Sequence, residues 1–463
     1  MSSGGGHGGG DFELPGFSGL HKWMEGSNDV GGFIIPGWGI IILFLIAILF
    51  YGANAPAQNA LNWQWVLMSG PLWMPILFGR FAMLRFLQMR RSRFNFNNPG
   101  VLLEIKIPRD IRKSPSAMEA LLSHIHINPG EGTWLKKYWW GRTRPWWSLE
   151  FASIGGEVHF YIWTRTNMRR LVEASFYAQY PEVELIEAVD YSRMRDPSER
   201  PYQMFACEYA FSKPDPYPIK TYIDFGIDKP GLKPEEQVDP IAGMLEVLGS
   251  IGPNEEIWTQ LIFRVSKGEK FRGAKNPATG KARSWREWGA EIVKDLRKKQ
   301  YDIAIELDGD GGSKFPNPTE VSKHIIEKIE RNVGKPGFDV GIRSIYSAPE
   351  EYYGKMNPFV AQLFRGFNTE LMNSITPAPL WSEKFNDYPW EDIGGFRQKI
   401  ENREAVEFYR YRSYFHPPYR GPWLIMSAEE LASIYHIPTA GVKTPGLPRI
   451  PSTTAAAPAN LPQ

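Results

Sequence analysis

A window of fifty residues without a charged side chain, Val30–Gly79, restricts the fold of this chain more than any other feature. Within this window Phe33–Ala53 reads FIIPGWGIIILFLIAILFYGA and is almost continuously apolar. About twenty residues of α-helix rise roughly 30 Å, which is the thickness of the hydrocarbon core of a bilayer. Since a buried helix of a soluble protein rarely needs that length without a polar face, the run predicts a transmembrane helix.

A cleaved secretory signal is the competing interpretation, because Ala53–Ala55 resembles a cleavage site. Two features disagree with it. The apolar run begins more than thirty residues into the chain, and Glu25 and Asp29 precede it in place of a basic cluster. Because Pro56 also follows the small residues directly, a retained membrane segment is the better interpretation.

A second apolar stretch, Trp65–Arg93, ends in a dense positive flank. It contains two prolines and Arg80, which membrane helices tolerate when neighbouring groups satisfy the backbone and when long cations reach the interface. The flank consists of Arg85, Arg90, Arg91 and Arg93. Because positive flanks stay in the cytoplasm, residues 33–93 are expected to form a transmembrane hairpin in the inner membrane, with the bulk of the chain cytoplasmic. The alternative is a single span followed by an amphipathic helix on the inner membrane surface.

The rest of the composition is that of a cytoplasmic protein with flexible ends. The formal net charge is only +2, so net charge alone does not indicate a polyanion binder. A single cysteine, Cys207, allows no disulfide within the chain and lies in an apolar run that predicts a buried thiol. Residues 1–32 form a Gly-rich tail, and the C-terminal segment 377–463 ends in a Pro- and Ala-rich tail.

Residues 98–192 show the pattern of a ferredoxin-like domain. A strand at 101–108 is followed by a helix for which Ser114 is the expected N-cap. Two strands joined at Gly155–Gly156, a helix over Asn167–Tyr180 and a further strand complete a β-α-β-β-α-β order. The pattern therefore predicts a compact α+β unit of about ninety residues.

Residues 200–376 predict a second α/β domain with a similar alternation, consistent with a diverged duplicate of the first. The region carries a charged insertion at 266–318 that includes the helical pattern WREWGAEIVKDLRKK. A last helix is expected over residues 427–436, where Ser427 and Glu430 have the spacing of a capping box. The predicted fold class is α+β: a transmembrane helical hairpin, the ferredoxin-like domain and the second α/β domain.

Motifs for catalysis, metal or nucleotide binding are incomplete throughout. Gly273–Ala282 has the wrong glycine spacing for a phosphate-binding loop and lacks the hydroxyl residue that would hold magnesium. Asp308–Ser313 lacks most ligands of a calcium loop, and His124 and His126 lie two apart, on different faces of a helix. We therefore expect no catalytic residue, no cofactor and no metal site, and the chain is predicted not to be an enzyme.

One stretch, WLKKYWWGRTRPWW at residues 134–147, combines five tryptophans with four cations and no carboxylate. Such a segment is typical of a membrane-interface belt, where Trp and Lys favour the headgroup zone. It also has the interleaved aromatic and basic residues of a single-strand nucleic-acid binder. The candidate nucleic-acid contacts are Trp134, Lys136, Lys137, Trp139, Trp140, Arg142 and Arg144. A structural linker with interfacial contact is the first interpretation, and nucleic-acid contact is the second.

The order of features resembles the membrane-anchored accessory region of conjugation and type IV secretion ATPases of the HerA–FtsK superfamily. Three stretches carry the similarity: Gly156–Tyr191, Gly334–Ala348 and, above all, Leu424–Pro462 with its EELA and HIP segments. In that family a segment of this kind leads into the motor domain, and here the sequence ends at Gln463. The resemblance therefore implies an accessory subunit whose ATPase is a separate chain, with no catalytic residue to carry over.

Two functions follow as hypotheses. The first is a membrane-anchored scaffold that docks a separate hexameric ATPase of a transfer machine and is oligomeric within that complex. Its expected contacts with the ATPase are Ser427, Glu429, Glu430, Leu431, Tyr435 and His436. The second is a membrane-bound protein that holds single-stranded nucleic acid through the stretch at 134–147.

Overall fold

The computed structural model describes most of the chain after residue 82 and little before it. Its described residues are 27–30, 33–36, 68, 71, 78–79, 82–109, 111, 113–127, 133–199, 201–228, 239–267, 284–308, 319–378, 396–416, 419–439, 441–442, 444 and 446–450. They divide into two units. Unit 1 contains residues 1–97, 131–143 and 385–396, and unit 2 contains residues 98–130, 144–384 and 397–463.

Unit 2 begins with the predicted β-α-β-β-α-β order, which we call repeat 1. Its elements are β3 (Gly100–Pro108), α4 (Ser116–Ile125), β4 (Trp147–Ile154), β5 (Glu157–Arg165), α5 (Arg169–Gln179) and β6 (Glu184–Glu187). The strands lie in the order β4-β5-β3-β6, and each neighbouring pair is antiparallel. Gly155 and Gly156 connect β4 and β5 with φ angles of 59° and 89°, a left-handed backbone that favours glycine. The N-cap of α4 is Pro115, one residue later than the Ser114 expected.

The same order follows a second time, in a segment we call repeat 2. Its elements are β7 (Tyr202–Phe211), α6 (Ile241–Gly249), β8 (Glu256–Val265), α7 (Trp285–Asp308), α8 (Glu320–Gly334), β9 (Gly337–Pro349), α9 (Asn357–Ala361) and β10 (Ile375–Ala378). The strands lie in the order β8-β9-β7-β10, again antiparallel throughout. With α7 and α8 set aside, repeat 2 has the element order and the pairing of repeat 1, which supports a duplication.

The two repeats form one continuous sheet because β4 pairs with β8. This pair is antiparallel, with Glu150 opposite Gln260 near its middle. The sheet order β10-β7-β9-β8-β4-β5-β3 therefore reads the same from either side of the β4–β8 junction, as an approximate twofold axis through that junction requires. Strands of both predicted α/β regions thus share one sheet.

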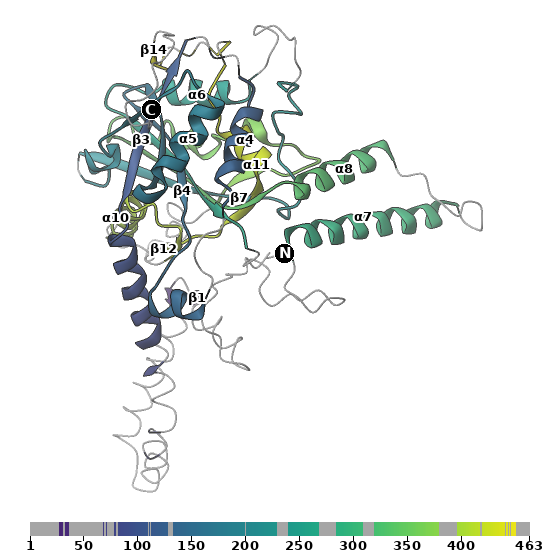
Figure 1. The fold of residues 1–463 in the computed structure, drawn as a ribbon, viewed down its shortest axis with the longest axis horizontal. Coiled ribbons are helices and arrows are strands. Elements are labelled where there is room, and N and C mark those ends of the chain that lie inside the picture. The colour runs from purple at the N-terminus through teal and green to yellow at the C-terminus, as the bar shows by residue number, and fades with distance from the viewer. Residues whose placement is uncertain are drawn as a thin grey trace. The chain divides into compact units, whose positions relative to one another are not determined.

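Helices cover one face of this sheet, as Figure 1 shows for α4, α5, α6 and α11 (Ala428–Ile434). The largest apolar core lies between this layer and the sheet. Leu121 of α4 and Leu245 of α6 belong to it, and both are fully buried. Tyr435, just after α11, packs its ring 4.6 Å from that of Phe151 on β4. This core is built by the alternate strand residues that face the helices.

The opposite face is covered by α10 (Phe396–Arg410) and the segment after it. That segment holds the short strands β11 (Phe415–His416) and β12 (Tyr419–Arg420). Tyr409 of α10 packs with Trp258 and Tyr161 of the sheet in a second, smaller core. A side chain at Gly341 of β9 would lie 2.3 Å from the ring of Tyr414, so only glycine allows the cover to approach this closely.

The chain then returns to the helical face through β13 (Leu424–Ser427), which pairs antiparallel with the start of β9. Helix α11 follows directly and lies beside α4. Farther on, β14 (Arg449–Ile450) pairs in parallel with the end of β3. Segments near the end of the chain therefore complete the helical layer and add a strand beside β3, far from them in sequence.

Unit 1 departs from the sequence prediction where it can be compared. Strand β1 (Ser27–Val30) pairs antiparallel with β2 (Phe33–Pro36), so the helix expected to start at Phe33 is wrong for these four residues. Glycines separate the two strands in sequence and Pro36 ends β2, which are signals for a hairpin rather than for a helix start. The remainder of the run to Ala53 lies outside the described residues.

Of the second predicted span, residues 68, 71, 78–79 and 82–93 are described; all of them are helical, and the helix at 82–93 continues to residue 96. Within the described part of the chain, no helix has both the length and the apolar character needed to cross a bilayer. The insertion loop at Gly273–Ala282 and most of Asp308–Ser313 are likewise outside the described residues.

Candidate functional site

The aromatic and basic stretch expected from the sequence is divided between the two units. Its first part, together with the helix at residues 82–97, forms what we call the aromatic-basic surface (residues 82–97 and 133–143 of unit 1). Here Arg90 donates a hydrogen bond from Nε to the carbonyl oxygen of Trp139 at 2.6 Å. The rings of Phe86 and Trp139 lie 5.7 Å apart. The two segments are therefore held against each other.

The second segment begins with a short π-helix, Leu135–Trp139, and turns back at Gly141. Gly141 has φ 64°, and a side chain there would lie 2.4 Å from the backbone of Arg90. Thr143 donates to the side chain of Asn95 at 2.9 Å just beyond the turn. A glycine turn and two hydrogen bonds thus fix this segment on the helix.

Three of the predicted tryptophans are exposed on this surface. Trp134 is 61% exposed, Trp139 55% and Trp140 50%. The predicted cations Lys136, Lys137 and Arg142 are partly exposed beside them. Large exposed apolar side chains are unusual on a water-facing surface when they gather in one place, and they mark contact with another molecule or with a membrane.

Arg144 does not belong to this surface, so the expected set of seven contacts is too long by one. It is 3% exposed and donates from Nη1 to the carbonyl oxygen of Val265 at 2.8 Å, inside unit 2. Trp146 and Trp147 are buried in unit 2 as well. The physical reason is that residues after Thr143 lead into β4, whose two faces are both covered.

The six expected ATPase contacts near α11 are all buried. Ser427, Glu430 and His436 have no measurable exposure, and the other three, Glu429, Leu431 and Tyr435, are at most 2% exposed. The predicted capping box is present: Ser427 accepts from the backbone N–H of Glu430 at 3.2 Å, and Glu430 accepts from that of Ser427 at 2.8 Å. In this structure these residues therefore bind other parts of the same chain and present no surface to a partner.

Glu429 is the charged centre of a network that joins α11 to α8. It accepts hydrogen bonds from Arg331 and from Thr221, and its Oε2 lies 2.7 Å from Nζ of Lys335. Burial by itself raises the pKa of Glu429, but these partners outweigh it and lower the pKa below its ordinary value. The network holds the start of α11 against the end of α8 by charge.

Glu430, the next residue, has neutral partners instead. Its carboxyl oxygens accept from the backbone N–H groups of Ile219 and Ser427 at 3.1 and 2.8 Å. Burial dominates and raises the pKa of Glu430 to about 8, since the backbone donors stabilise the charged form only in part. The two adjacent glutamates therefore carry different charges near neutral pH.

His436 and Asp239 form a buried pair that ties the end of α11 to the start of α6. His436 Nε2 lies 2.9 Å from Oδ1 of Asp239, and Nδ1 lies 3.0 Å from the carbonyl oxygen of Ala432. Both neighbours are acceptors, so both ring nitrogens must carry a proton for both hydrogen bonds to form. Burial alone raises the pKa of Asp239, but the attraction of His436 outweighs it and lowers the pKa. With side-chain exposures of 0% and 3%, the pair has a structural role.

A buried polar network under α10 was not expected from the sequence. At its centre Arg412 donates to both oxygens of Glu150, each at 3.0 Å, and also contacts Asp190. Tyr191 donates to Glu150 at 2.8 Å, and Gln260 donates to it at 2.7 Å. The side chains of Glu150 and Arg412 are 0% and 2% exposed. The network fastens the segment after α10 to the centre of the sheet.

A second arginine, Arg343 of β9, lies in the same layer. It donates from Nε and Nη2 to Oε1 of Gln260 at 2.9 and 2.6 Å. It also donates to the carbonyl oxygens of Ser413 and Phe408 at 3.1 and 2.6 Å. Arginines are mostly exposed in folded proteins, so only their contacts in the folded structure identify these two as buried.

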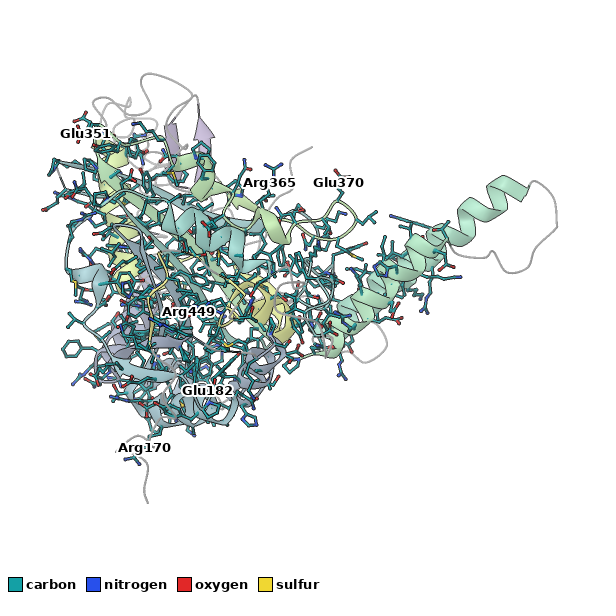
Figure 2. All side chains as sticks on the ribbon, turned by 90° about the horizontal axis from the view of Figure 1, so that it is seen from above. Arg170, Glu182, Glu351, Arg365, Glu370 and Arg449 are labelled. Carbon is teal, nitrogen blue, oxygen red and sulfur yellow. The ribbon has the colours of Figure 1, made fainter. Side chains whose placement is uncertain are left out.

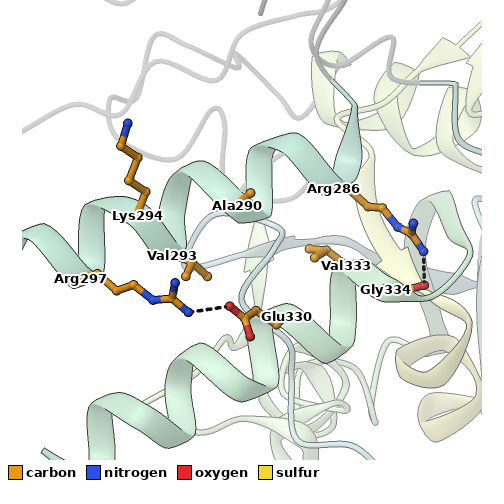
Figure 3. Close-up of a pocket in the computed structure, with 8 residues that line it drawn as sticks. All are labelled: Arg286, Ala290, Val293, Lys294, Arg297, Glu330, Val333 and Gly334. Atoms are coloured by element: carbon orange, nitrogen blue, oxygen red, sulfur yellow. Dashed lines mark hydrogen bonds and ion pairs between the residues drawn. The ribbon is translucent and has the colours of Figure 1, made fainter. Parts of the chain in front are cut away.

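The helices α7 and α8 form an antiparallel pair, which we call the arm. A small apolar cluster of Val293, Ile326, Ile329 and Val333 holds them together. Arg297 donates to Glu330 at 2.9 Å, and Arg286 donates to the carbonyl oxygen of Gly334 at 3.0 Å (Figure 3). In Figure 2 the arm extends from the body of unit 2, with side chains drawn on the part nearest the body.

An open groove of about 420 Å³ follows the arm (Figure 3). Its lining contains three cations and one carboxylate: Arg286, Ala290, Val293, Lys294, Arg297, Glu330, Val333 and Gly334. Figure 3 shows Lys294 directed away from α8. The groove therefore has more cations than carboxylates in its lining, beside the apolar side chains of Ala290, Val293 and Val333.

Residues with possible metal or thiol chemistry lie elsewhere. Cys207 is buried, as its apolar surroundings predicted. His124 lies in the last turn of α4 and His126 is its C-cap, with Nε2 3.3 Å from the carbonyl oxygen of Gly337. The described residues contain no group of three His, Cys, Asp or Glu side chains able to hold one metal ion.

Comparison with known proteins gives a family match. No curated protein matches the sequence. A protein-family model described as Domain of unknown function (DUF8128) matches residues 91–448, which include both repeats, α10 and α11. Because this match spans more than half of the chain, the protein belongs to the DUF8128 family.

Proposed function

We propose that this protein is a non-enzymatic, membrane-anchored scaffold that docks a separate hexameric ATPase of a transfer machine similar to conjugation or type IV secretion systems. The observation that carries the proposal is the arm. Repeat 1 joins β4 and β5 through two glycines, whereas repeat 2 places α7 and α8 between the corresponding strands β8 and β9. A hairpin connection needs only two residues, so the arm serves something other than connecting strands.

The arm suits a docking role because most of its surface remains available. Its buried apolar residues hold the two helices together and leave Lys294, Arg297 and Lys298 exposed. Two packed helices present a stiffer surface than a loop does, so less conformational entropy is lost on binding. The groove along them fits an acidic, amphipathic segment of a partner.

The arm replaces α11 as the proposed contact with the ATPase. The residues first expected to make this contact, around Ser427 and Glu430, are fixed inside unit 2. Deleting them would remove core side chains such as Leu431 and Tyr435, and loss of binding would then report unfolding. The uncharged window at residues 30–79 and the resemblance to ATPase accessory regions support the membrane-anchored, cytoplasmic placement.

Reversing charge on the arm tests this proposal. The full chain carrying Lys294→Glu, Arg297→Glu and Lys298→Glu should recover several times less of the candidate ATPase in co-purification, because the groove loses its positive charge. A matched control carries Arg170→Glu, Lys355→Glu and Arg365→Glu, which reverse three exposed cations on the body of unit 2 and change the net charge by the same amount. Equal recovery by both variants, with unchanged circular dichroism, would count strongly against docking through the arm.

Single-stranded nucleic-acid binding is the second candidate, favoured by the exposed tryptophans beside cations in residues 133–143. Each cation that contacts phosphate adds to the salt dependence of binding. The variant Lys136→Ala, Lys137→Ala, Arg142→Ala should then bind more weakly, with a smaller salt slope. This candidate fails if the full chain in detergent shows no affinity for single strands at low salt.

A further inference from the structure

We infer that the aromatic-basic surface binds the anionic headgroups of the membrane beside the anchor, with its helix and its tryptophans in the interface. The inference deepens the proposed function and rests on its membrane anchorage, since it names the lipid class that orients the scaffold. The partner is an acidic phospholipid surface, contacted by residues 82–97 and 133–143.

The exposed face of the helix has the composition of an interfacial helix. Arg85, Met89, Arg93 and Phe96 are exposed, and they recur three or four residues apart, so they share one face. Phe96 is 87% exposed and Met89 is 56% exposed. Cations alternate with large apolar groups along this face, as they do in helices that lie in the plane of a membrane interface.

The second segment adds aromatic residues at the same place. Trp139, which the helix holds through Arg90 and Phe86, remains 55% exposed. Leu135 and Trp140 are about equally exposed, at 49% and 50%. Tryptophan prefers the headgroup zone because its ring is amphipathic. A fixed π-helix therefore presents several interface-seeking side chains together.

Charge complementarity and chain continuity select the lipid surface as the partner. The two segments contain seven Lys and Arg residues and no Asp or Glu. The helix at residues 82–97 follows the uncharged window Val30–Gly79 closely in sequence, and it holds the second segment through Arg90 and Phe86. An anchor in that window therefore keeps both segments near the bilayer. Anionic lipids attract such cations across the distance over which salt screens charge.

The aliphatic members favour lipid over nucleic acid. Bases stack on aromatic rings and arginine planes, and cations pair with phosphates. Met89 and Leu135 have neither property, yet both are exposed on this surface. In an interface both would be buried among acyl chains, which removes apolar area from water.

Spin labelling of the full chain tests the inference. Leu135→Cys and, as control, Val321→Cys on the arm are labelled separately in a Cys207→Ala background; the two native positions are 49% and 50% exposed. The chain is reconstituted in phosphatidylcholine vesicles with or without phosphatidylglycerol. A neutral, water-soluble nickel relaxant then reports water access, so vesicle charge does not bias the probe.

We expect anionic vesicles to reduce nickel access at position 135 by about fivefold relative to neutral vesicles, given the usual contribution of one cation at an anionic surface. Access at position 321 should not change. Adding Lys136→Gln and Arg142→Gln should restore most of the access at 135. Unchanged access at position 135, or an equal change at 321, overturns the inference.

Two further measurements separate the inference from the proposed function. Flotation with neutral vesicles tests whether the chain is anchored in the bilayer independently of lipid charge. If the chain floats but anionic lipid does not reduce nickel access at position 135, the inference is overturned and the anchored scaffold is left intact. Flotation only with anionic vesicles, together with protection, supports the surface contact and overturns the transmembrane anchor. Protection at position 135 by single-stranded DNA in detergent, and not by anionic lipid, assigns the surface to nucleic acid instead.

Discussion

Repeat 1 and repeat 2 meet where β4 pairs with β8. At equivalent positions near the middle of this pair, one repeat has a glutamate and the other a glutamine. Glu150 of β4 and Gln260 of β8 lie opposite each other near the middle of the junction, and each accepts from a buried arginine. Arg412 binds the glutamate and Arg343 binds the glutamine. The approximate symmetry of the sheet therefore places a carboxyl acceptor beside an amide acceptor, each facing a buried arginine.

The two arginines respond in opposite directions to this difference. Burial lowers the pKa of Arg343, and the surrounding groups do not make up for it. Burial acts on Arg412 in the same sense, but Glu150 and Asp190 outweigh it, so the pKa of Arg412 rises well above its ordinary value. A duplicated scaffold can thus keep its backbone while one half gains an ion pair and the other keeps neutral hydrogen bonds.

The largest expected effect on stability comes from removing Arg412, the arginine that binds Glu150. Arg412→Met leaves Glu150 buried without its cation and should lower the free energy of unfolding by about 3–5 kcal/mol. Chemical unfolding of the full chain in detergent, followed by circular dichroism, measures this. The double variant Glu150→Met, Arg412→Met should recover most of the loss, because the remaining Asp190 is partly exposed. If the double variant is no more stable than the single one, the ion pair is not the cause.

Arg343→Met removes the arginine whose hydrogen-bond acceptors are neutral, and it should lower the free energy of unfolding by less. It leaves the side-chain oxygen of Gln260 and two carbonyl oxygens without this donor, for an expected loss of about 1–3 kcal/mol in the same unfolding assay. A loss equal to that of Arg412→Met would show that partner charge does not distinguish the repeats.

Glu430 sharpens the comparison, because it is a buried carboxyl whose hydrogen-bond donors are neutral. Its folded-state pKa of about 8 lies above the ordinary value of 4.5, so between these pH values the folded chain holds a proton that the unfolded chain has lost. Its contribution to stability is therefore complete below about pH 4.5 and is lost as the pH rises through 8.

We expect the free energy of unfolding to fall by about 1–2 kcal/mol from this group between pH 6.5 and pH 8. In Glu430→Gln, which cannot titrate, that part of the slope should disappear, although the variant loses one hydrogen-bond acceptor. Unfolding curves at several pH values compare the two chains. An unchanged slope in the variant assigns the pH dependence to other groups.

The smallest effect concerns the two strand connections. Gly156→Ala places a side chain at φ 89° and should cost about 1 kcal/mol, because only glycine adopts this backbone without strain. Gly334→Ala at the end of the arm meets open space and should change stability by less than about 0.5 kcal/mol. Thermal unfolding of both variants measures the contrast. Equal losses would mean that the turn and the arm are under the same constraint.

Most elements of the two repeats could be predicted from the sequence, because their signals are local. The glycines at 155–156, the apolar spacing of α4 and the capping box at Ser427 and Glu430 each lie within a few residues. Burial of α11 could not be predicted in this way. A capping box fixes where a helix starts, and it says nothing about what packs around the helix.

The buried network was missed for a related reason. Glu150 and Arg412 are 262 residues apart, so no local pattern connects them. Charged residues are usually exposed, and an isolated glutamate in a strand is naturally taken as solvent-facing. The exposed tryptophans were found because their density is itself unusual, whereas the separation of Arg144 from them depends on tertiary packing.

The parallel pairing of β14 with β3 has a consequence for biosynthesis. These partners, Arg449–Ile450 and Ile107–Pro108, are separated by more than three hundred residues. A ribosome adds roughly 5–20 residues per second, so β3 emerges many seconds before β14 can join it. Until β14 has been synthesised, the end of β3 lacks this partner strand, and an unpaired strand edge can pair with other chains. We therefore expect nascent chains that stop before residue 449 to associate with chaperones more than complete chains do.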